Sequence, residues 1–364
     1  MKSKLYILLL CIPIIASAAK VPEASKVIKE TFQVSGPVNL FVDNGYGDID
    51  VNVGSADEVT IEVEIKATGG SDKAEAFVES TDIKFIQSGN KISAVTQEGV
   101  KNKSNWFKWG SGKFSYKVNY KITIPKTTDL DIDHKHGKIY IEDISGSMDI
   151  DLGYGDLLAG DVSGTLDLDL RHGDAVIGDV GGDSEISISY GELILADINN
   201  AEIKSKNSEI EIGTVLDASI FSNYDEYEIG QAGNVYNEGS YNEFEIDRVE
   251  SLVLDAEHTN YEINWIRKSV EAETNYGSIE ISDSSADFNK ADFTGEHTDI
   301  ALVIKGGFSF NLEGKHSGFD LPRKTQYESK IKDGKNKTYI GYYDREGSCT
   351  VTGKMLYGEI KIRD

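Results

Sequence analysis

The stretch Tyr154-Gly155-Asp156-Leu157-Leu158-Ala159 decides the fold, because close copies of it follow at residues 172–177 and 190–195. Each copy begins with a tyrosine or histidine, continues with a glycine and an acidic residue, and ends in aliphatic residues. Related units recur as far as Tyr357. We call the position that corresponds to Gly155 in each unit the glycine-type position, whichever residue occupies it. Between residues 137 and 277 these positions are 17 or 18 residues apart. So constant a period predicts a chain that returns to the same place in every turn, whereas a meander of hairpins needs no fixed repeat.

The aliphatic residues of each unit alternate with polar ones, as in Ile139 and Ile141, and this period of two predicts a strand with one buried face. A second alternating strand, such as residues 166–170, precedes each glycine-type position. One unit cannot bury its apolar face alone, so the units must stack. We therefore predict an all-β protein, a parallel β-solenoid (β-helix) with rungs of 17–18 residues. At ~4.8 Å per rung the rod would be on the order of 55 Å long, and parallel crossovers favour right-handed winding.

Residues 19–133 repeat less clearly, and we expect them to form an irregular β cap that covers the end of the rod. Residues 46–51 are one isolated copy of the unit, and segments such as 59–65 and 116–124 alternate as strands. No segment of useful length shows helical periodicity. The solenoid is expected to occupy residues 134–364.

Residues 1–18 have the pattern of a signal peptide, with Lys2 and Lys4 before an apolar run and a small-residue cleavage site at residues 16–18. The apolar run is short for a bilayer, and no later stretch approaches ~20 apolar residues, so we expect no transmembrane segment in the mature chain. The protein is therefore expected to be exported to the periplasm or the cell surface. Cys349 would be the only cysteine left after cleavage, which rules out an intramolecular disulfide, and we expect this thiol to be buried.

The charge of the chain restricts its partners. There are 62 acidic and 37 basic residues, for a net charge of −25. Nucleic acids and anionic lipids bind cationic surfaces, so we do not expect either as the main partner. No nucleophile-elbow, Walker or zinc-protease motif is present, and the short units leave little chain for loops that would build a catalytic cleft.

The residue before each glycine-type position is expected to point outward. Because the turns are expected to stack in chain order, these residues should follow one another down the coil from His136 to His316 and then Tyr357, with Asn207 among them. The members that we single out as candidate ligand-binding residues are Tyr154, His172, Tyr190, Tyr224, Tyr241, His258 and Tyr276. Stacking between neighbouring strands is one explanation, worth ~0.2–1 kcal/mol per pair. The other is a platform for sugar rings or a peptide, since each ring offers a flat apolar face and a polar tip.

The residue after the glycine-type position is acidic in six consecutive units. These residues, called here the acidic column, are Asp156, Asp174, Glu192, Glu209, Glu226 and Glu243. Unit charges ~4.8 Å apart repel by about 0.9 kcal/mol in water. Splayed rotamers and counter-ions are one way to relieve this repulsion, and a bound divalent cation such as calcium is the other. The glycine-rich nonapeptide of calcium-binding β-rolls is missing.

Two basic segments stand out in this acidic chain. Trp106 and Trp109 lie among lysines in residues 101–114, where they either contact a glycan or membrane headgroups or plug the end of the rod. Residues 323–337 are also basic, and we expect them to form a solvated loop.

The chain resembles the "putative adhesin" family of exported bacterial proteins with short β-strand repeats, a domain family of unknown function. The resemblance is carried by residues 44–51, by residues 118–125 and by the Gly-Asp/Glu-aliphatic units that follow. It covers most of the mature chain and implies a β-solenoid with a role in the cell envelope or at the surface. It supplies no catalytic residues. Units with Asp225 or Asn242 at the glycine position depart from the family pattern.

These features together lead us to expect a non-enzymatic, adhesin-like protein that binds a glycan or a surface protein along the solenoid face. Self-association into an end-to-end structural scaffold is the alternative. The residues favour a third function, a polysaccharide-degrading enzyme, less than either of these. Calcium in the acidic column is the one cofactor that the residues suggest.

Overall fold

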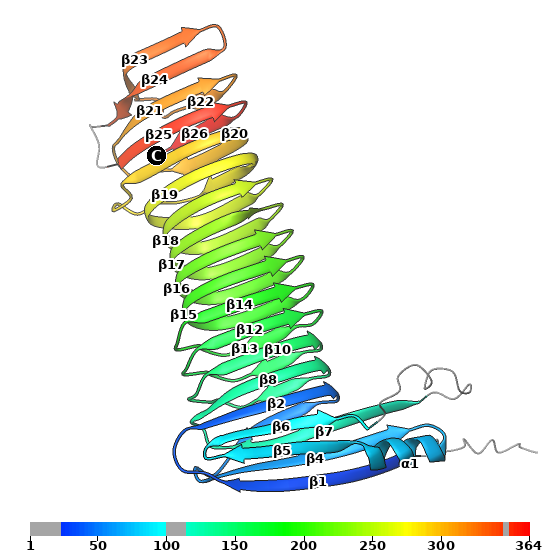
Figure 1. The fold of residues 1–364 in the computed structure, drawn as a ribbon. Coiled ribbons are helices and arrows are strands. Elements are labelled where there is room, and N and C mark those ends of the chain that lie inside the picture. Colours follow the sequence, from blue (N-terminus) through cyan, green and yellow to red (C-terminus); the bar gives the residue numbers. More distant parts are fainter. Residues whose placement is uncertain (1–22, 100–113, 345–348) are drawn as a thin grey trace, which may run out of the picture.

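The computed structural model describes residues 23–99, 114–344 and 349–364, and strands dominate these residues. In this part of the chain, 26 strands form one sheet, accompanied by the single helix α1. The predicted all-β class is therefore confirmed. The sheet is mixed, however, because antiparallel pairs lie at both ends of a central stack of parallel strands (Figure 1).

The central stack is built from parallel neighbours that are one repeat apart in the sequence. In its first part each turn has two short strands, and Met148 pairs with Leu166, 18 residues on. These strands are β8 (Thr128–His136), β9 (Ile139–Ile141), β10 (Met148–Tyr154), β11 (Leu157–Ala159), β12 (Leu166–Arg171), β13 (Ala175–Ile177) and β14 (Ser184–Ser189). The register repeats the period of the sequence because each turn buries the same apolar positions.

Further along the stack the two strands of a turn run together without a break. These long strands are β15 (Glu192–Lys206), β16 (Glu209–Asn223), β17 (Glu226–Ser240), β18 (Glu243–Glu257) and β19 (Asn260–Ile281). The period here is 17 residues, since Glu192 pairs with Glu209 and Glu209 with Glu226.

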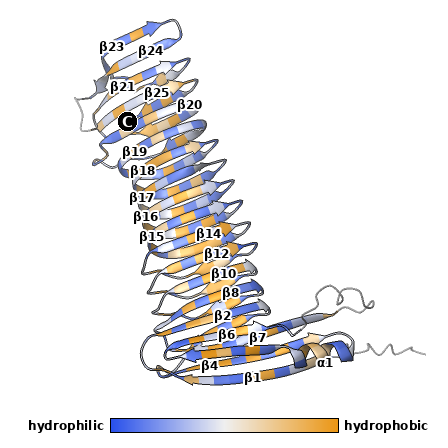
Figure 2. Cartoon of the chain, viewed as in Figure 1, coloured by the Kyte–Doolittle hydropathy of each residue, from blue (hydrophilic) through white to orange (hydrophobic). Residues whose placement is uncertain are grey.

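Alternation along the strands separates the core from the surface. Figure 2 shows apolar residues alternating with polar ones along the stacked strands. Ile212 and Ile281, which occupy the same aliphatic position of their units as Ile141, are each 1% exposed, whereas Glu209 is exposed. Burying such an aliphatic side chain stabilises the fold by about 1.5–3 kcal/mol.

The isolated copy of the unit at residues 46–51 belongs to the first turn of this stack. It spans the end of β2 (Val38–Tyr46) and the start of β3 (Ile49–Val53), which pair in parallel with β8 and β9. The chain then leaves the stack and returns to it at β8. The excursion contains most of the strands at the base of Figure 1.

The strands at the base are β1 (Glu23–Gln33), β4 (Glu58–Thr68), β5 (Asp82–Ser88), β6 (Lys91–Gln97) and β7 (Ser115–Ile124). Antiparallel pairs join β1 to β4, β4 to β7 and β5 to β6. In addition, β6 pairs in parallel with β2, and β7 with β3, so the base continues the sheet beneath the first turn.

The helix α1 (Ser71–Ser80) corrects the expectation that no useful helical segment exists. It buries Ala74, Phe77 and Val78, which share one face by their spacing of three and four residues. The ring of Phe77 lies 4.2 Å from that of Tyr116 on β7. With only three buried positions in ten residues, the helix leaves too weak a periodic signal to be recognised from sequence. No helix in the described part of the chain has the length and apolar character needed to cross a membrane.

The C-terminal strands lie in a different order in space than in the sequence. The last two, β25 (Cys349–Leu356) and β26 (Glu359–Arg363), pair on one side with β20 (Lys290–Val303). On the other side they pair with the earlier strands β21 (Phe308–Lys315) and β22 (Gly318–Asp320). The chain therefore leaves a gap of one turn and later fills it, and the expectation that turns stack in chain order to the end is wrong.

Residues 323–337, expected to be a solvated loop, instead contribute to a hairpin of two strands, β23 (Gln326–Asp333) and β24 (Asn336–Tyr343). Gly334, with a φ of 60°, and Lys335 form its two-residue turn. Because β24 also pairs antiparallel with β21, this hairpin makes the far end of the sheet mixed.

Cys349 is 1% exposed and unpaired, as expected. Burial raises the pKa of its thiol to about 12, so the thiolate that would react with oxidants is strongly disfavoured.

Candidate functional site

The residues before the glycine-type positions form a stack of rings along one corner of the molecule, called here the aromatic ladder. Its first run is Tyr46, His136, Tyr154, His172 and Tyr190, and its second is Tyr224, Tyr241, His258, Tyr276, His297, Tyr357 and His316. Neighbouring ring centroids are 4.5 to 5.0 Å apart, and the ring planes differ by 2 to 27°. Tyr357 lies between His297 and His316, which corrects the chain-order expectation.

The backbone of the ladder is in a conformation that tyrosine and histidine residues rarely adopt. From His172 onward, the ladder residues have φ values of 51 to 62°. This left-handed region costs an ordinary residue about 1–2 kcal/mol, and glycine or asparagine accommodates it best. Ring stacking returns about 0.5–1.5 kcal/mol per pair, so the ladder roughly offsets the strain at its own corner.

Stacking leaves little free ring face in the ladder. A ring inside a run has neighbours against both faces, so only its edge and polar tip meet solvent, whereas the ring at each end of a run stacks on one side. The ladder tyrosines are accordingly 42 to 57% exposed. The expected platform of flat faces is thus corrected to a row of edges and hydroxyl groups, except where the ladder is interrupted at Asn207.

Under the second run, buried polar residues replace the glycines of the repeated unit. Asp225 is 4% exposed, and its carboxylate accepts hydrogen bonds from the backbone N–H of Ser208 at 2.8 Å and of Asn223 at 2.7 Å. The hydroxyl of Ser205 donates a third bond, at 2.7 Å. Loss of solvation by burial raises the pKa of Asp225 above its usual value, although these three donors act in the opposite direction.

The same buried network continues to the next turn. Asn242 accepts a hydrogen bond from the backbone N–H of Asp225 at 3.0 Å and donates one to the Ser222 hydroxyl at 2.9 Å. Two buried tyrosines also take part, Tyr227 with Ser205 and Tyr261 with Asn237. Sequence analysis noted that Asp225 and Asn242 depart from the glycine pattern but did not identify this network, whose signal is polar residues at consecutive glycine-type positions.

The acidic column has two parts with different surroundings. Near its start, the carboxylate of Asp156 lies 2.8 Å from the Lys138 ammonium group, and that of Asp174 accepts a hydrogen bond from the Glu192 N–H at 3.1 Å. The rest is the glutamate column, namely Glu192, Glu209, Glu226 and Glu243, which are neighbours in register. These four glutamates are exposed and make no ion pair with any residue that the structure describes.

The calcium hypothesis gains no geometric support from this arrangement. Among residues 23–99, 114–344 and 349–364, no group of three or more histidine, cysteine, aspartate or glutamate side chains is placed to hold a metal ion. Regular outward spacing keeps the carboxylates apart, whereas a calcium ion needs six to eight oxygen ligands that converge on it.

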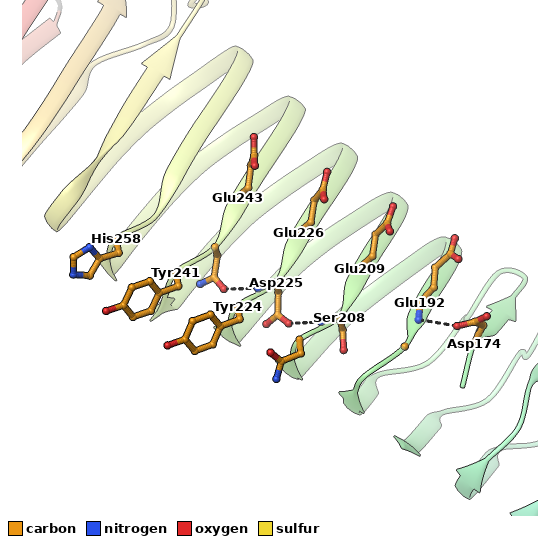
Figure 3. A pocket seen from close by; sticks show the side chains of 13 residues that line it. Asp174, Glu192, Ser208, Glu209, Tyr224, Asp225, Glu226, Tyr241, Glu243 and His258 are labelled. Atoms are coloured by element: carbon orange, nitrogen blue, oxygen red, sulfur yellow. Dashed lines mark hydrogen bonds between the residues drawn. The ribbon is translucent and has the colours of Figure 1, made fainter. Parts of the chain in front are cut away.

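A groove lies between the ladder and the glutamate column (Figure 3). It has a volume of about 780 Å³ and is open to solvent along its length. Its lining residues are Asp174, Gly191, Glu192, Asn207, Ser208, Glu209, Tyr224, Asp225, Glu226, Tyr241, Asn242, Glu243 and His258. The fold thus brings part of the aromatic candidates and most of the acidic candidates to one groove. We call it the ladder groove.

Other predicted site residues lie outside this lining. Tyr154, His172, Tyr190 and Tyr276 belong to the ladder but do not line the groove, and Asp156 lies at the start of the acidic column. Trp106 and Trp109 fall outside the described residues.

A second acidic surface was missed by sequence analysis. Asp131, Asp149 and Asp167 are neighbours in register on β8, β10 and β12. Burial and like charges raise the pKa of Asp131 and Asp149. The signal that identifies them in the sequence is the same 18-residue period, because aspartates one period apart lie on neighbouring turns.

Comparison with known proteins finds similarity among solved structures. No family model and no curated protein matches the chain. A crystal structure described as a "putative cell adhesion protein" from Clostridium sporogenes ATCC 15579 is 11% identical and has a TM-score of 0.22, covering 93% of this chain and 99% of that one. A "putative adhesin" from Bacteroides fragilis NCTC 9343 is 12% identical and has a TM-score of 0.30, and the match covers 71% of this chain and 97% of that one.

A "putative lipid binding protein" from Parabacteroides distasonis ATCC 8503 is 14% identical and has a TM-score of 0.30, with 71% of this chain and 96% of that chain covered. The adhesin descriptions agree with the resemblance found in the sequence. At these identities and TM-scores the likeness assigns no residue a role, and the ladder groove has to be judged on its own geometry.

Proposed function

We propose that this protein is a non-enzymatic binding protein that holds an extended partner, a glycan or a segment of a surface protein, in the ladder groove. The observation that carries the proposal is the meeting of two regular columns, tyrosines and glutamates, at one groove of about 780 Å³. A partner with its own repeat can contact successive turns ~4.8 Å apart. Many weak contacts along one polymer add up to useful affinity.

The chemistry of the groove supports binding rather than turnover. Asp225, the groove carboxylate whose pKa is displaced, uses both oxygens for hydrogen bonds within the chain. A catalytic acid or base would need a free oxygen within reach of the substrate. The tyrosine edges and glutamate carboxylates are suited to hydrogen bonds with hydroxyl or N–H groups of a polymer.

The proposal extends to the whole chain. The parallel register supports a β-solenoid with 17–18-residue turns, which we propose to be right-handed. In this view, residues 1–18 are a signal peptide, residues 19–133 serve as the cap and residues 134–364 as the solenoid. The protein then works in the periplasm or at the cell surface.

A direct test compares binding by the wild type and by variants of the ladder groove. Envelope glycans on an array and immobilised surface proteins serve as targets. The double variants Tyr224→Ser/Tyr241→Ser and Glu209→Gln/Glu226→Gln should each bind the true partner at least about tenfold more weakly, with unchanged circular dichroism. Tyr357→Ser, in the same ladder but away from the groove, is the matched control and should bind normally. Equal binding by all variants, or cleavage of any target polymer, would refute the proposal.

Self-assembly is a second candidate function, favoured by the hairpin at the far end of the stack. Among the described strand pairs, β23 pairs only with β24, and its Ile331 is 57% exposed between Lys330 and Lys332. A strand with a free edge can pair with another chain, and its lysines would favour an acidic copy of the protein. Sedimentation velocity should then show concentration-dependent assembly, which Ile331→Asp abolishes.

A further inference from the structure

The aromatic ladder is interrupted once within the central stack, at Asn207. Backbone hydrogen bonds link Tyr190 to Lys206, Asn207 to Asn223, and Tyr224 to Ser240, so Asn207 occupies the turn between the two tyrosines. Tyr190 stacks on His172, and Tyr224 stacks on Tyr241. Each of these tyrosines therefore has one covered face and one face turned toward the interrupted position.

The gap at Asn207 has the thickness of one ring. Single-turn spacings on either side of it are 5.0 and 4.8 Å, so Tyr190 and Tyr224 lie roughly 10 Å apart at two strand spacings. A flat group midway between them would have the same centroid spacing as the rings of the ladder. Asparagine is much shorter than tyrosine and leaves the outer part of this gap open. We call this space the slot.

The charges beside the slot select the sign of its occupant. Glu192, Glu209 and Glu226 belong to the same three turns as Tyr190, Asn207 and Tyr224. These carboxylates are exposed and unpaired within the described chain. The nearest cation along the sequence, Lys206, is in register with Ser189 and Asn223, on the strands that precede the ladder.

We propose that the slot binds the guanidinium group of an arginine in an extended segment of a partner protein. A guanidinium is flat, so it stacks between two tyrosine faces, and its five N–H donors can reach the Asn207 side-chain oxygen and the neighbouring glutamates. The inference rests on the proposed function, because it names the partner class of the ladder groove. It also assigns Asn207 as the residue that sets specificity.

Competing occupants satisfy fewer of these features. A neutral pyranose or an aromatic side chain gains the stack but leaves the glutamates unpaired. A lysine ammonium satisfies the charge but is a compact, strongly hydrated group that cannot fill a flat slot. Arginine is favoured because it is both flat and cationic.

The test uses a fluorescein-labelled peptide, Gly-Lys-Thr-Lys-Arg-Lys-Thr-Lys-Gly, and the full chain, with fluorescence anisotropy as the readout. Analogues replace the central arginine by lysine, citrulline or tyrosine. Citrulline keeps the flat shape and removes the charge. The wild type should bind the arginine peptide about five- to tenfold more tightly than any analogue, as two stacked faces predict. Unlabelled chitohexaose, a neutral glycan, is tested as a competitor and should not displace the peptide.

Asn207→Tyr is the decisive variant, because it closes the slot with the residue that the ladder uses at the neighbouring turns. Tyrosine is accommodated at φ values of 60 to 62° in Tyr190, Tyr224 and Tyr241, so the melting temperature should be kept or raised. Preference for arginine over lysine should fall to about onefold, while affinity for the lysine analogue changes by less than about twofold. Asn207→Gly leaves the slot open but removes the side-chain oxygen, so it should keep part of the preference. His297→Tyr, which alters the ladder outside the groove, should keep all of it.

The outcomes separate this inference from the function on which it rests. If Glu209→Gln/Glu226→Gln weakens all peptides but Asn207→Tyr keeps the arginine preference, the groove binds its partner and the slot proposal is wrong. A wild type that treats arginine and citrulline alike, or that prefers tyrosine or chitohexaose, also overturns the slot proposal. If no peptide and no glycan binds, both proposals fail.

Discussion

Ile212 and Glu209 lie three residues apart on β16 and on opposite sides of the strand, so substitutions at these positions test the buried and the exposed face of one turn. Ile212→Asp would place an unpaired charge among aliphatic residues, and we expect the free energy of unfolding to fall by more than about 4 kcal/mol. Glu209→Lys relieves repulsion in the glutamate column and should be neutral within about 0.5 kcal/mol or slightly stabilising. Thermal and urea denaturation give both values, and similar losses for the two variants would contradict the register.

For single residues, the sequence predicts which face of a strand a side chain occupies better than it predicts the backbone conformation. The alternation that marks Ile212 as buried and Glu209 as exposed is local, and the structure agrees with it. Stacking of the ladder rings is one of the two explanations that the repeat offers, and the structure agrees with it. Which ring faces stay open depends on residues 17 or 18 positions away. Left-handed backbone at Tyr190 and Tyr224 could not be predicted, since local propensity assigns such positions to glycine or asparagine.

At the scale of elements, β8, β10 and β12 bring like charges together at a cost to stability. Asp149 lies between Asp131 and Asp167 and pairs with no cation in the described chain. Asp149→Asn should therefore raise the melting temperature, with a gain of a few tenths of a kcal/mol because the side chains are partly solvated.

Asp151→Asn on the same strand is the matched control for that change. Asp151 accepts a hydrogen bond from the Arg171 guanidinium at 2.7 Å, so its loss should be neutral or slightly destabilising. Differential scanning calorimetry at low salt compares the two. A rise for both variants, or for neither, would mean that register neighbours do not control the repulsion.

Elements that depend on distant contacts are the ones that sequence analysis missed or misplaced. Strand β23 is exposed at nearly every residue and carries Lys330 and Lys332, so it has the composition of a loop although it pairs with β24. Insertion of β25 between β20 and β21, and of β26 between β20 and β22, involves no local signal at all. Period and alternation could be read in the central stack because every turn there repeats the same neighbours.

For the whole molecule, stability at mildly acidic pH is a balance between carboxylates and one buried histidine. Burial and like charges raise the pKa of Asp131, Asp133 and Asp149. A raised carboxyl pKa means that the folded state binds protons first, so stability increases as pH falls toward the unfolded value of about 3.9. On their own, these groups would make the protein more stable at pH 5 than at pH 7.

His134 acts in the opposite direction. It is 2% exposed, and burial lowers its pKa, although its ring nitrogens lie 3.0 Å from the Asn44 carbonyl oxygen and 2.8 Å from that of Gly47. A histidine whose folded pKa is lowered loses stability as pH falls below its unfolded value of about 6.5. Leu152 and Leu170 occupy the same place in the next two turns, so leucine fits this column.

The variant His134→Leu separates these two contributions. It loses the two carbonyl contacts and should melt lower than the wild type at pH 7.5. Between pH 7 and pH 5, however, its melting temperature should rise more steeply as pH falls, because only the carboxylates then titrate. Below about pH 4 both proteins should lose stability, since carboxylates with lowered pKa values, such as Asp48 beside Lys117, become protonated. If the melting temperatures of the two proteins instead changed equally with pH between pH 7 and pH 5, the protonation of His134 would not differ between the folded and unfolded chain. That result would overturn the assigned balance.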